Sequence, residues 1–498
     1  MTDFLLALLA LSASSLVLGL LLIPLAKIAA VRIGLVDKPD NRRKIHAREV
    51  PVVGGVAVFM AASMAMLVAL LVPSTVQDAC LTNWPRLVSI WLACAILCML
   101  GVVDDKRPIR GRQKLLFQLL ALAVLMSSGF IIRKLHIFGT DLDLGLLAGP
   151  FTILWLLGGI NSINLLDGMD GLLGTIGVVL SVAMAAMALL EGQLYTAVIA
   201  ATLIGALLSF LVFNFPPASI FMGDGGSMPI GLLIGIMSVQ VTGRDAPVAW
   251  APFVALAVLT VPMLDTLAAV VRRKMTGRSM FSTDRSHLHH QLLRKGLSPR
   301  GALFVVAGLT VASAAGAIAS ILLGMEWVAI VTPIVLVGLL IGTRYFGYAE
   351  FMLVLKQSRV TVMRVIFGQS KGRAQQMEVR LQGSMAWDEL WVHLVKRAGQ
   401  LELVSMCLDV NAPAIHEGYY AFWESFGYST GEDRGGWLAE IPLESWGPVV
   451  GRVVLKGRQL DVEFWRKIGE IALVIKEFET PGLPMAPARP QQAVAQAS

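Results

Sequence analysis

The chain has 498 residues, of which 56% are apolar and only 15% are charged, whereas soluble domains carry about 25% charged residues. A mean hydropathy of +0.71 excludes a single water-soluble globular core, because so much apolar surface cannot be buried in one. The composition also excludes disordered, collagenous and disulfide-stapled classes. The net charge of +7 raises the question of a polyanionic partner such as nucleic acid.

Apolar segments of about 20 residues are expected to span a bilayer as helices. The sequence has eleven such segments, of which the fifth and eighth are short. The first lacks a basic start and is too long for the apolar part of a signal peptide, so we interpret it as a retained span. The predicted spans cover residues 4–26, 51–72, 86–103, 115–132, 148–163, 173–190, 194–213, 229–242, 249–271, 301–323 and 327–343.

Basic residues are distributed unequally between the two sides of these spans. Twenty Lys and Arg residues lie on one side and four on the other, so the positive-inside rule places the basic side in the cytoplasm. We therefore predict a multi-span α-helical membrane protein with its N-terminus outside and its C-terminus inside. Its cytoplasmic loops would be residues 34–55, 101–114, 161–174, 214–227 and 272–296.

The composition changes after residue 343, where charged residues become frequent and long apolar runs stop. Helical periodicity at 386–400 and 461–478 and strand-like segments at 403–410, 436–443 and 449–456 indicate a small α/β domain. We predict a membrane core over 1–343, a cytoplasmic accessory domain over 344–480, and a disordered Pro/Ala/Gln-rich tail over 481–498.

The predicted cytoplasmic loops concentrate carboxylates and amides among glycines. Asp104 and Asp105 are adjacent and repel each other unless a cation or a basic group compensates, although an ordinary solvated loop is an alternative. Asp and Asn oxygens suit Mg²⁺, a hard cation that also keeps substrate phosphates in its shell, but tight turns between spans use the same residues. No P-loop or dinucleotide-binding motif is present. The other candidates in these loops are Asn161, Asn164, Asp167, Asp170 and Asp224.

Three histidines, His287, His289 and His290, fall within four residues, shortly after Arg285. No cysteine or carboxylate has a spacing that would complete a zinc site. A solvated basic loop is one interpretation. The other is an anion clamp that holds a diphosphate and stabilises charge as a P–O bond breaks. His46, in the basic first loop, is a further candidate for phosphate contact.

Taken together, five loops place Asp, Asn, Lys, Arg and His on one membrane face. A phosphoryl transfer between a soluble nucleotide and a membrane-bound phosphate needs this combination of groups. A transporter would instead bury charges at mid-membrane, and an inactive scaffold would have lost the Asp pair or the histidine cluster.

The motifs DKPDNRRKIH with PVVGG, DD at a span end, NSINLLDGMDGL, FMGDGGS and DRSHLHH resemble those of the polyprenyl-phosphate N-acetylhexosamine-1-phosphate transferase superfamily, glycosyltransferase family 4. The resemblance covers residues 34–300 through motifs and 1–343 through the spans. Such enzymes move a sugar 1-phosphate from a UDP-sugar to a polyprenyl phosphate and release UMP. The resemblance thus implies a bacterial inner-membrane enzyme with a cytoplasmic active site, and the basic charge then meets phosphates rather than nucleic acid.

The last motif indicates the branch. Enzymes that act on UDP-MurNAc-pentapeptide carry three consecutive histidines after a proline, whereas this chain has SHLHH at 286–290. The sequence therefore resembles the undecaprenyl-phosphate GlcNAc-1-phosphate transferases that start O-antigen, enterobacterial common antigen or teichoic-acid glycans. Phospho-MurNAc-pentapeptide transfer and a non-enzymatic lipid transporter or scaffold are the alternatives.

The resemblance also implies roles for individual residues. Asp224 would be the main ligand of Mg²⁺, or of Mn²⁺, with Asn164 as a second contact. The Asp104–Asp105 pair would bind metal or deprotonate the lipid phosphate, with Asp104 favoured as the base, and Lys114 would lie near that phosphate.

The remaining roles concern the nucleotide sugar, for which the resemblance implies contacts from several loops. The residues are Asn161, Asn164, Asp167 and Asp170 for nucleotide or sugar, Phe221 for the uracil, Arg285, His287, His289 and His290 for the diphosphate and amino sugar, and Lys44 and His46 for phosphate. The family does not account for the accessory domain, for which docking of a downstream glycosyltransferase and regulation by a ligand remain open. For the protein as a whole, a homodimer or downstream glycosyltransferases are the partners considered.

Overall fold

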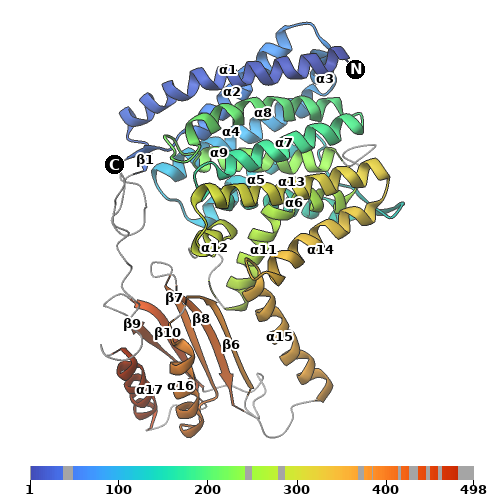
Figure 1. The fold of residues 1–498 in the computed structure, drawn as a ribbon. Coiled ribbons are helices and arrows are strands. Elements are labelled where there is room, and N and C mark those ends of the chain that lie inside the picture. The colour runs from blue at the N-terminus through green and yellow to red at the C-terminus, as the bar shows by residue number, and fades with distance from the viewer. Residues whose placement is uncertain are drawn as a thin grey trace. The chain divides into compact units, whose positions relative to one another are not determined.

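The computed structural model describes residues 2–37, 49–241, 249–276, 278, 286–367, 375–383, 385–412, 417–425, 436–444, 449–457 and 463–479. The chain forms two compact units (Figure 1). The first comprises Met1–Leu267 and His287–Tyr345, and the second comprises Ala268–Ser286 and Phe346–Ser498. The second unit therefore includes a segment that the sequence analysis assigned to the membrane core.

The first unit is a bundle of apolar helices. Each of the eleven predicted spans coincides with a helix or a helix pair. The helices are α1 (Thr2–Ile33), α2 (Gly54–Leu71), α3 (Thr75–Thr82), α4 (Trp84–Lys106), α5 (Gly111–Ser127), α6 (Ala148–Leu166), α7 (Leu172–Leu190), α8 (Leu194–Asn214), α9 (Asp224–Gln240), α10 (Pro252–Val258), α11 (Thr260–Met275), α12 (Leu288–Arg294), α13 (Pro299–Leu323) and α14 (Glu326–Gly342).

Not all of these helices are long and apolar enough to cross a membrane. In the part of the chain that the structure describes, seven meet that test, and an eighth span results if α10 and α11 are counted together. The multi-span membrane architecture is confirmed, but the number of eleven spans is not. The physical reason is length, since α5, α9 and α14 have 17 residues each, at the lower limit for a span.

The ninth predicted span is broken, because α10 and α11 meet at a bend of 87°. Pro262 lies two residues into α11 and has no N–H to donate to the carbonyl of Val258, which lies four residues earlier. That carbonyl accepts a hydrogen bond of 3.2 Å from the hydroxyl of Ser313 in α13. The Ser313 hydroxyl also contacts the carbonyl of Ala257. The carbonyl groups freed at the bend thus accept hydrogen bonds from a neighbouring helix, as is usual for broken membrane helices.

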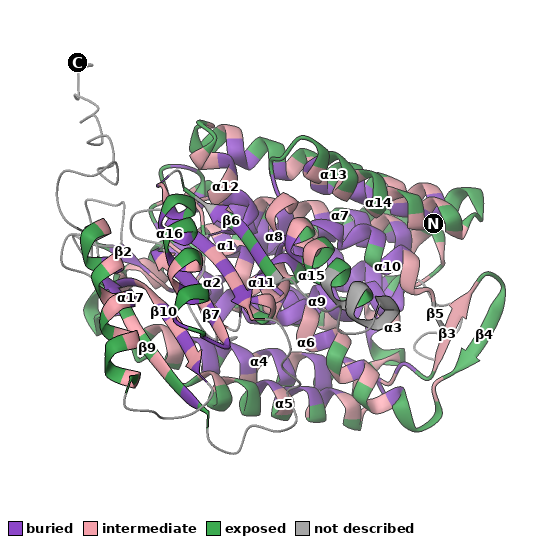
Figure 2. Cartoon of the chain, turned by 90° about the horizontal axis from the view of Figure 1, so that it is seen from below, coloured by how far each residue is buried: buried purple, intermediate pink, exposed green. Residues whose placement is uncertain are grey.

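Helix α9 lies at the centre of the bundle, where it packs against α2, α4, α6 and α7. Every residue from Gly225 to Gln240 is buried, and α9 is correspondingly purple in Figure 2. Its N-terminal residue is Asp224, so the packing of the bundle fixes the position of this carboxylate.

Short strands lie outside the helices of the first unit. Strands β1 (Val36–Asp37) and β2 (Val50–Pro51) pair antiparallel, and a second sheet has the order β4–β3–β5. Its members are β3 (Lys134–Ile137), β4 (Thr140–Asp143) and β5 (Ala249–Trp250), followed after β4 by the single-turn helix η1 (Gly145–Leu147).

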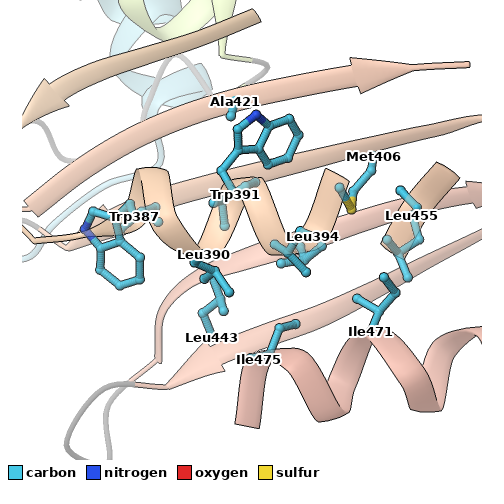
Figure 3. Packing of buried hydrophobic residues seen from close by; sticks show 14 of the residues in the cluster. Trp387, Leu390, Trp391, Leu394, Met406, Ala421, Leu443, Leu455, Ile471 and Ile475 are labelled. Atoms are coloured by element: carbon cyan, nitrogen blue, oxygen red, sulfur yellow. The ribbon is translucent and has the colours of Figure 1, made fainter. Parts of the chain in front are cut away.

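The second unit contains a five-stranded antiparallel sheet with the order β6–β8–β7–β10–β9. Side chains of α16 and α17, such as Trp391 and Ile471, pack on one face of the sheet in an apolar core (Figure 3). Helix α15 packs on β6 through Leu353, which contacts Met377 and Val379. The elements are α15 (Tyr348–Phe367), β6 (Gln375–Gln382), α16 (Trp387–Gln400), β7 (Ser405–Ala412), β8 (Glu417–Glu424), β9 (Trp437–Glu444), β10 (Val449–Gly457) and α17 (Phe464–Glu479).

Candidate active site

The first and fourth predicted loops are joined by backbone hydrogen bonds. The N–H groups of Gly54 and Gly55 donate to the carbonyls of Phe221 and Met222, each at 2.9 Å. A Cβ on Gly55 would lie 2.1 Å from the backbone of Gly226, so only glycine permits this approach. The PVVGG motif therefore acts structurally, by holding the FMGD turn at the start of α9.

The carboxylate of Asp105 caps the N-terminus of α9. Its two oxygens accept hydrogen bonds from the backbone N–H groups of Asp224 at 3.1 Å and Gly225 at 3.3 Å. A negative charge is favourable at this end of a helix, because unpaired N–H groups and the helix dipole are exposed there. Helix α4 can approach closely enough because it has glycine at position 101, where a Cβ would meet the backbone of Asp224 and Gly225 at 2.2 Å.

The ammonium group of Lys114 joins two carboxylates from different helices. Its Nζ lies 3.2 Å from Oδ2 of Asp104 and also contacts Oδ2 of Asp224. The other oxygen of Asp224 accepts a hydrogen bond of 2.7 Å from Nδ2 of Asn164, and the same amide group donates to Ser227. Helices α4, α5, α6 and α9 therefore each contribute a polar side chain to one cluster.

A fourth carboxylate, Asp167, follows α6 and lies beside this cluster. Burial, followed by the negative charges of Asp224 and Asp105, raises the pKa of the Asp167 carboxyl to about 8. Four carboxylates thus lie close together, and the ammonium group of Lys114 contacts two of them, Asp104 and Asp224. Negative charge is therefore in excess among these described side chains. Neighbouring negative charges disfavour the ionisation of each carboxyl group unless a cation compensates.

This donor set fits Mg²⁺, which prefers carboxylate and amide oxygens. Among the described residues, no three His, Cys, Asp or Glu side chains converge as a preformed metal site. Asp104 and Asp224 instead contact Lys114, whose ammonium supplies positive charge to both.

The histidine cluster lies next to the same cluster of carboxylates. Nδ1 of His287 lies 2.8 Å from Oδ2 of Asp265, whose other oxygen accepts the backbone N–H of Leu288 at 2.7 Å. The ring of His289 packs on Gly168, where a Cβ would lie 2.5 Å from Nε2. Gly168 directly follows Asp167, so the histidine and carboxylate groups meet at the loop between α6 and α7.

His289 is buried, and among the residues that the structure describes neither of its ring nitrogens has a hydrogen-bond partner. Burial lowers its pKa well below the usual range, and the neighbouring His290 and His287 add to the shift. The ring is therefore neutral and can both donate and accept a hydrogen bond. A buried polar group without a partner is rare in native proteins, and a catalytic role or a bound ligand is one explanation for it.

Three predicted substrate-binding residues hold other parts of the protein. Nδ2 of Asn161 donates to the carbonyl of Leu157 at 2.8 Å, and its Oδ1 lies 3.4 Å from the amide of Gln118. Oδ2 of Asp170 accepts the N–H of Ala218 at 2.9 Å. The side chain of Phe221 is half-buried, and its backbone joins the two loops described above. Lys44, His46 and Arg285 lie outside the described residues.

Asp265 was not among the candidate site residues predicted from the sequence. A carboxylate inside an otherwise apolar span is costly, and such residues are generally functional. The position of Asp265 in the sequence therefore indicates a functional residue. Its partner could not be identified, because His287 lies 22 residues away beyond a loop of unknown path.

The fold and this cluster define a multi-span membrane enzyme whose polar groups suit the handling of phosphates. Residues 87–242 match the family model described as glycosyl transferase family 4. Similar proteins include the probable undecaprenyl-phosphate N-acetylglucosaminyl 1-phosphate transferase of Bacillus subtilis, 32% identical over 59% of this chain and 79% of the relative. The undecaprenyl-phosphate alpha-N-acetylglucosaminyl 1-phosphate transferase of Salmonella typhimurium is 32% identical over 59% of this chain and 78% of the relative.

A third relative is the decaprenyl-phosphate N-acetylglucosaminephosphotransferase of Mycolicibacterium smegmatis, 32% identical over 56% of this chain and 74% of that protein. The chain therefore belongs to glycosyl transferase family 4, in the branch of the undecaprenyl-phosphate GlcNAc-1-phosphate transferases.

Proposed function

We propose that the protein transfers an N-acetylhexosamine 1-phosphate from a UDP-sugar to undecaprenyl phosphate, releases UMP and starts a lipid-linked cell-envelope glycan. The observation that carries the proposal is the position of Lys114 between the carboxylates of Asp104 and Asp224. It is supported by the buried ring of His289, which has no hydrogen-bond partner among the described residues and lies against Gly168. An ammonium group, a potential cation site and neutral hydrogen-bond donors are the groups that phosphoryl transfer requires.

GlcNAc is the sugar that the names of the similar proteins favour. By position in the motifs, the site would face the cytoplasm of a bacterial inner membrane, where UDP-sugars are available. The apolar helices would hold the lipid tail, so that the acceptor phosphate reaches the level of Lys114.

The reaction conserves the number of phosphoanhydride-type bonds. An oxygen of the lipid phosphate attacks the β-phosphorus of the UDP-sugar, and a new P–O–P link forms. The bond from that phosphorus to the oxygen bridging the α-phosphate breaks, and UMP leaves with the bonding electron pair. Asp104 would accept a proton if the lipid phosphate binds as the monoanion, and Lys114 would orient the acceptor oxygen.

Asp224, Asn164, Asp104 and Asp105 would hold Mg²⁺, which neutralises the charge of the diphosphate when bound. The neutral ring of His289 would donate a hydrogen bond to the diphosphate, with His287 and His290 beside it. Removing one such preorganised group costs about 10²–10³ in turnover in other enzymes.

The test uses the purified full-length protein with undecaprenyl phosphate, UDP-GlcNAc and Mg²⁺, and measures UMP and the lipid product. We expect wild-type turnover, a fall of about 10²-fold for Asp224→Asn, and no change for the control Asp78→Asn, an exposed aspartate of α3. Absence of UMP release by the wild type, or full turnover of Asp224→Asn, contradicts the proposal. A panel of UDP-sugars that includes UDP-MurNAc-pentapeptide identifies the donor.

A further inference from the structure

Helix α5 carries Lys114 at its start, but few of its side chains are buried in the bundle. The helix packs mainly against α4, and the buried members of its 17 residues are Gln118, Ala121, Leu122 and Leu125. The last three are apolar and lie at least two helical turns beyond Lys114. Gln118, which is 2% exposed, is therefore the buried side chain of α5 that lies nearest to the ammonium group along the helix.

Gln118 shares a face of α5 with Lys114, because residues that are four apart are neighbours on a helix surface. Asn161 and Asn164 are three apart and share a face of α6 in the same way. Lys114 and Asn164 both contact the carboxylate of Asp224. Each of the two helices therefore presents one polar side chain to the carboxylate cluster and a second one, a turn further into the bundle.

The two amide groups of this inner layer contact each other. Nε2 of Gln118 lies 3.4 Å from Oδ1 of Asn161, and Nδ2 of Asn161 lies 3.4 Å from Oε1 of Gln118. Nδ2 of Asn161 also donates to the carbonyl of Leu157 at 2.8 Å, which orients this amide group within α6. Nε2 of Gln118 lies 3.6 Å from Sδ of Met228 in α9. Reciprocal amide contacts thus link α5 to α6 one turn away from the ammonium group.

This link does not depend on the carboxylates of the site. A buried amide group is costly unless it is paired, and among the described residues Asn161 supplies the only oxygen and nitrogen contacts of the Gln118 side chain. The contacts of Lys114 with Asp104 and Asp224 are exchanged when substrate phosphates or a cation bind to the same groups. The amide contact is retained during that exchange and keeps α5 at the same distance from α6.

We propose that Gln118 is a positioning residue for the transferase, which acts through Asn161 to hold α5 beside α6 and thereby keeps the ammonium group of Lys114 at the acceptor phosphate. This inference rests on the proposed function. Gln118 itself contacts neither substrate. The proposal gives Asn161 a partner in α5, in place of the nucleotide or sugar that the resemblance implied, and it adds a site residue that lies outside all of the loop motifs.

The test compares Gln118→Leu with the matched control Gln240→Leu in the full-length protein. Gln240 is also buried, and its Oε1 accepts a hydrogen bond of 3.2 Å from Thr196. It lies at the far end of α9, about 24 Å from Asp224 along the helix. Both substitutions should lower Tm, because both remove a buried amide contact.

The two KM values separate positioning from a loss of stability. We expect Gln118→Leu to raise the KM for undecaprenyl phosphate about tenfold, as for the loss of one buried hydrogen bond, and to leave the KM for UDP-GlcNAc unchanged. Gln240→Leu should change neither value. A KM for the lipid that does not rise in Gln118→Leu, or that rises no more than the KM for UDP-GlcNAc, overturns the positioning role.

An exchanged pair tests the amide contact itself. The double variant Gln118→Asn with Asn161→Gln keeps both amide groups and exchanges their lengths, so it should regain most of the activity that Gln118→Asn loses. A purely apolar requirement at position 118 predicts no such recovery, and a double variant that is no more active than Gln118→Asn contradicts the proposal. These variants keep a polar side chain at position 118 and decide the question also if Gln118→Leu does not fold.

A third measurement needs no turnover. An amine-specific acetylating reagent should modify Lys114 faster in Gln118→Leu than in the wild type and in Gln240→Leu, because the ammonium group is then held less firmly at the two carboxylates. Lys106, which is exposed at the end of α4, is the internal reference for mass spectrometry. Equal rates at Lys114 in the wild type and Gln118→Leu overturn the positioning role. If the wild type releases no UMP, the proposed function fails, and this rate alone decides whether Gln118 positions Lys114.

Discussion

Oδ2 of Asp265 lies 2.8 Å from Nδ1 of His287, and both side chains are almost fully buried. The carboxylate comes from the bent α10–α11 segment, whereas the histidine precedes α12. The carboxylate accepts a hydrogen bond from the Nδ1–H group of His287, and this fixes the tautomer of the ring. Nε2 is then the nitrogen that is free of this contact.

Asp265→Asn should therefore impair catalysis while the protein still folds. The amide replaces a charged acceptor, whose hydrogen bond is worth about 1.5–3 kcal/mol, and each 1.4 kcal/mol corresponds to about tenfold. We expect kcat/KM for UMP release to fall about 10- to 100-fold. Asp265→Glu serves as the charge-retaining comparison, and equal activity of the wild type and Asp265→Asn would show that the pair has no catalytic role.

His289→Phe should separate stability from activity. The two buried nitrogens of the wild-type ring have no partner in the described part of the chain, which costs about 1–3 kcal/mol, so an apolar ring of similar shape should keep or raise Tm. UMP release should fall at least tenfold, since the ligand loses its hydrogen-bond partner. His393→Phe, at an exposed position of α16, should alter neither quantity. A large loss of Tm in His289→Phe would instead assign a structural role to this histidine.

Asp167 should make the stability of the metal-free protein depend on pH. Its pKa of about 8 in the folded state lies above the usual value near 3.9 in the unfolded chain, so the folded state binds an extra proton between these values. The free energy of unfolding should therefore fall as pH rises from about 4 to about 8. Melting curves in the presence of a chelator should show a weaker decline for Asp167→Asn, and identical slopes would contradict the assignment.

Gly101→Ala should disturb the contact between α4 and α9. The added methyl group would lie 2.2 Å from backbone atoms of Asp224 and Gly225, and overpacking of this kind costs about 1–3 kcal/mol. We expect a lower Tm and, because the separation of Asp105 from the start of α9 increases, less UMP release. Gly308→Ala is the matched control in α13, since nothing lies within 4 Å of its Cβ position. Equal effects of the two substitutions would exclude the close contact.

The sequence predicted the helices of the bundle well, because long apolar segments have few alternatives to helix in a membrane. It also predicted that the loop motifs meet, and of the predicted residues the structure joins Asp104, Asp105, Lys114, Asn164 and Asp224 by hydrogen bonds. The 87° bend at Leu259 could not be predicted, because Pro262 permits a break without requiring one, and the compensating hydroxyl of Ser313 lies more than 50 residues away.

Within the site, the residue types indicated candidate side chains, but the sequence could not identify the groups that these side chains contact. Asp105 was expected to contact metal or substrate, and the structure additionally uses it as the cap of α9. Asp170 was predicted to bind nucleotide or sugar, and its carboxylate accepts a backbone N–H from Ala218. Such contacts between distant loops depend on tertiary packing. In the accessory domain, the predicted segments match β7, β9, β10, α16 and α17. No segment was predicted for α15, β6 or β8.

The proximity of four carboxylates, of which two contact Lys114, has a consequence for the evolution of this protein. Residues chosen only for folding would not place like charges together, so the site trades conformational stability for catalytic capacity. Asp105→Asn, which keeps a side chain able to cap α9, should melt at a higher temperature than the metal-free wild type and be less active. Added Mg²⁺ should raise the Tm of the wild type more than that of the variant, because a ligand that binds only the folded state stabilises it. The higher Tm of the variant and the higher Tm of the Mg²⁺-bound wild type would then have the same cause, which is weaker repulsion between these carboxylates.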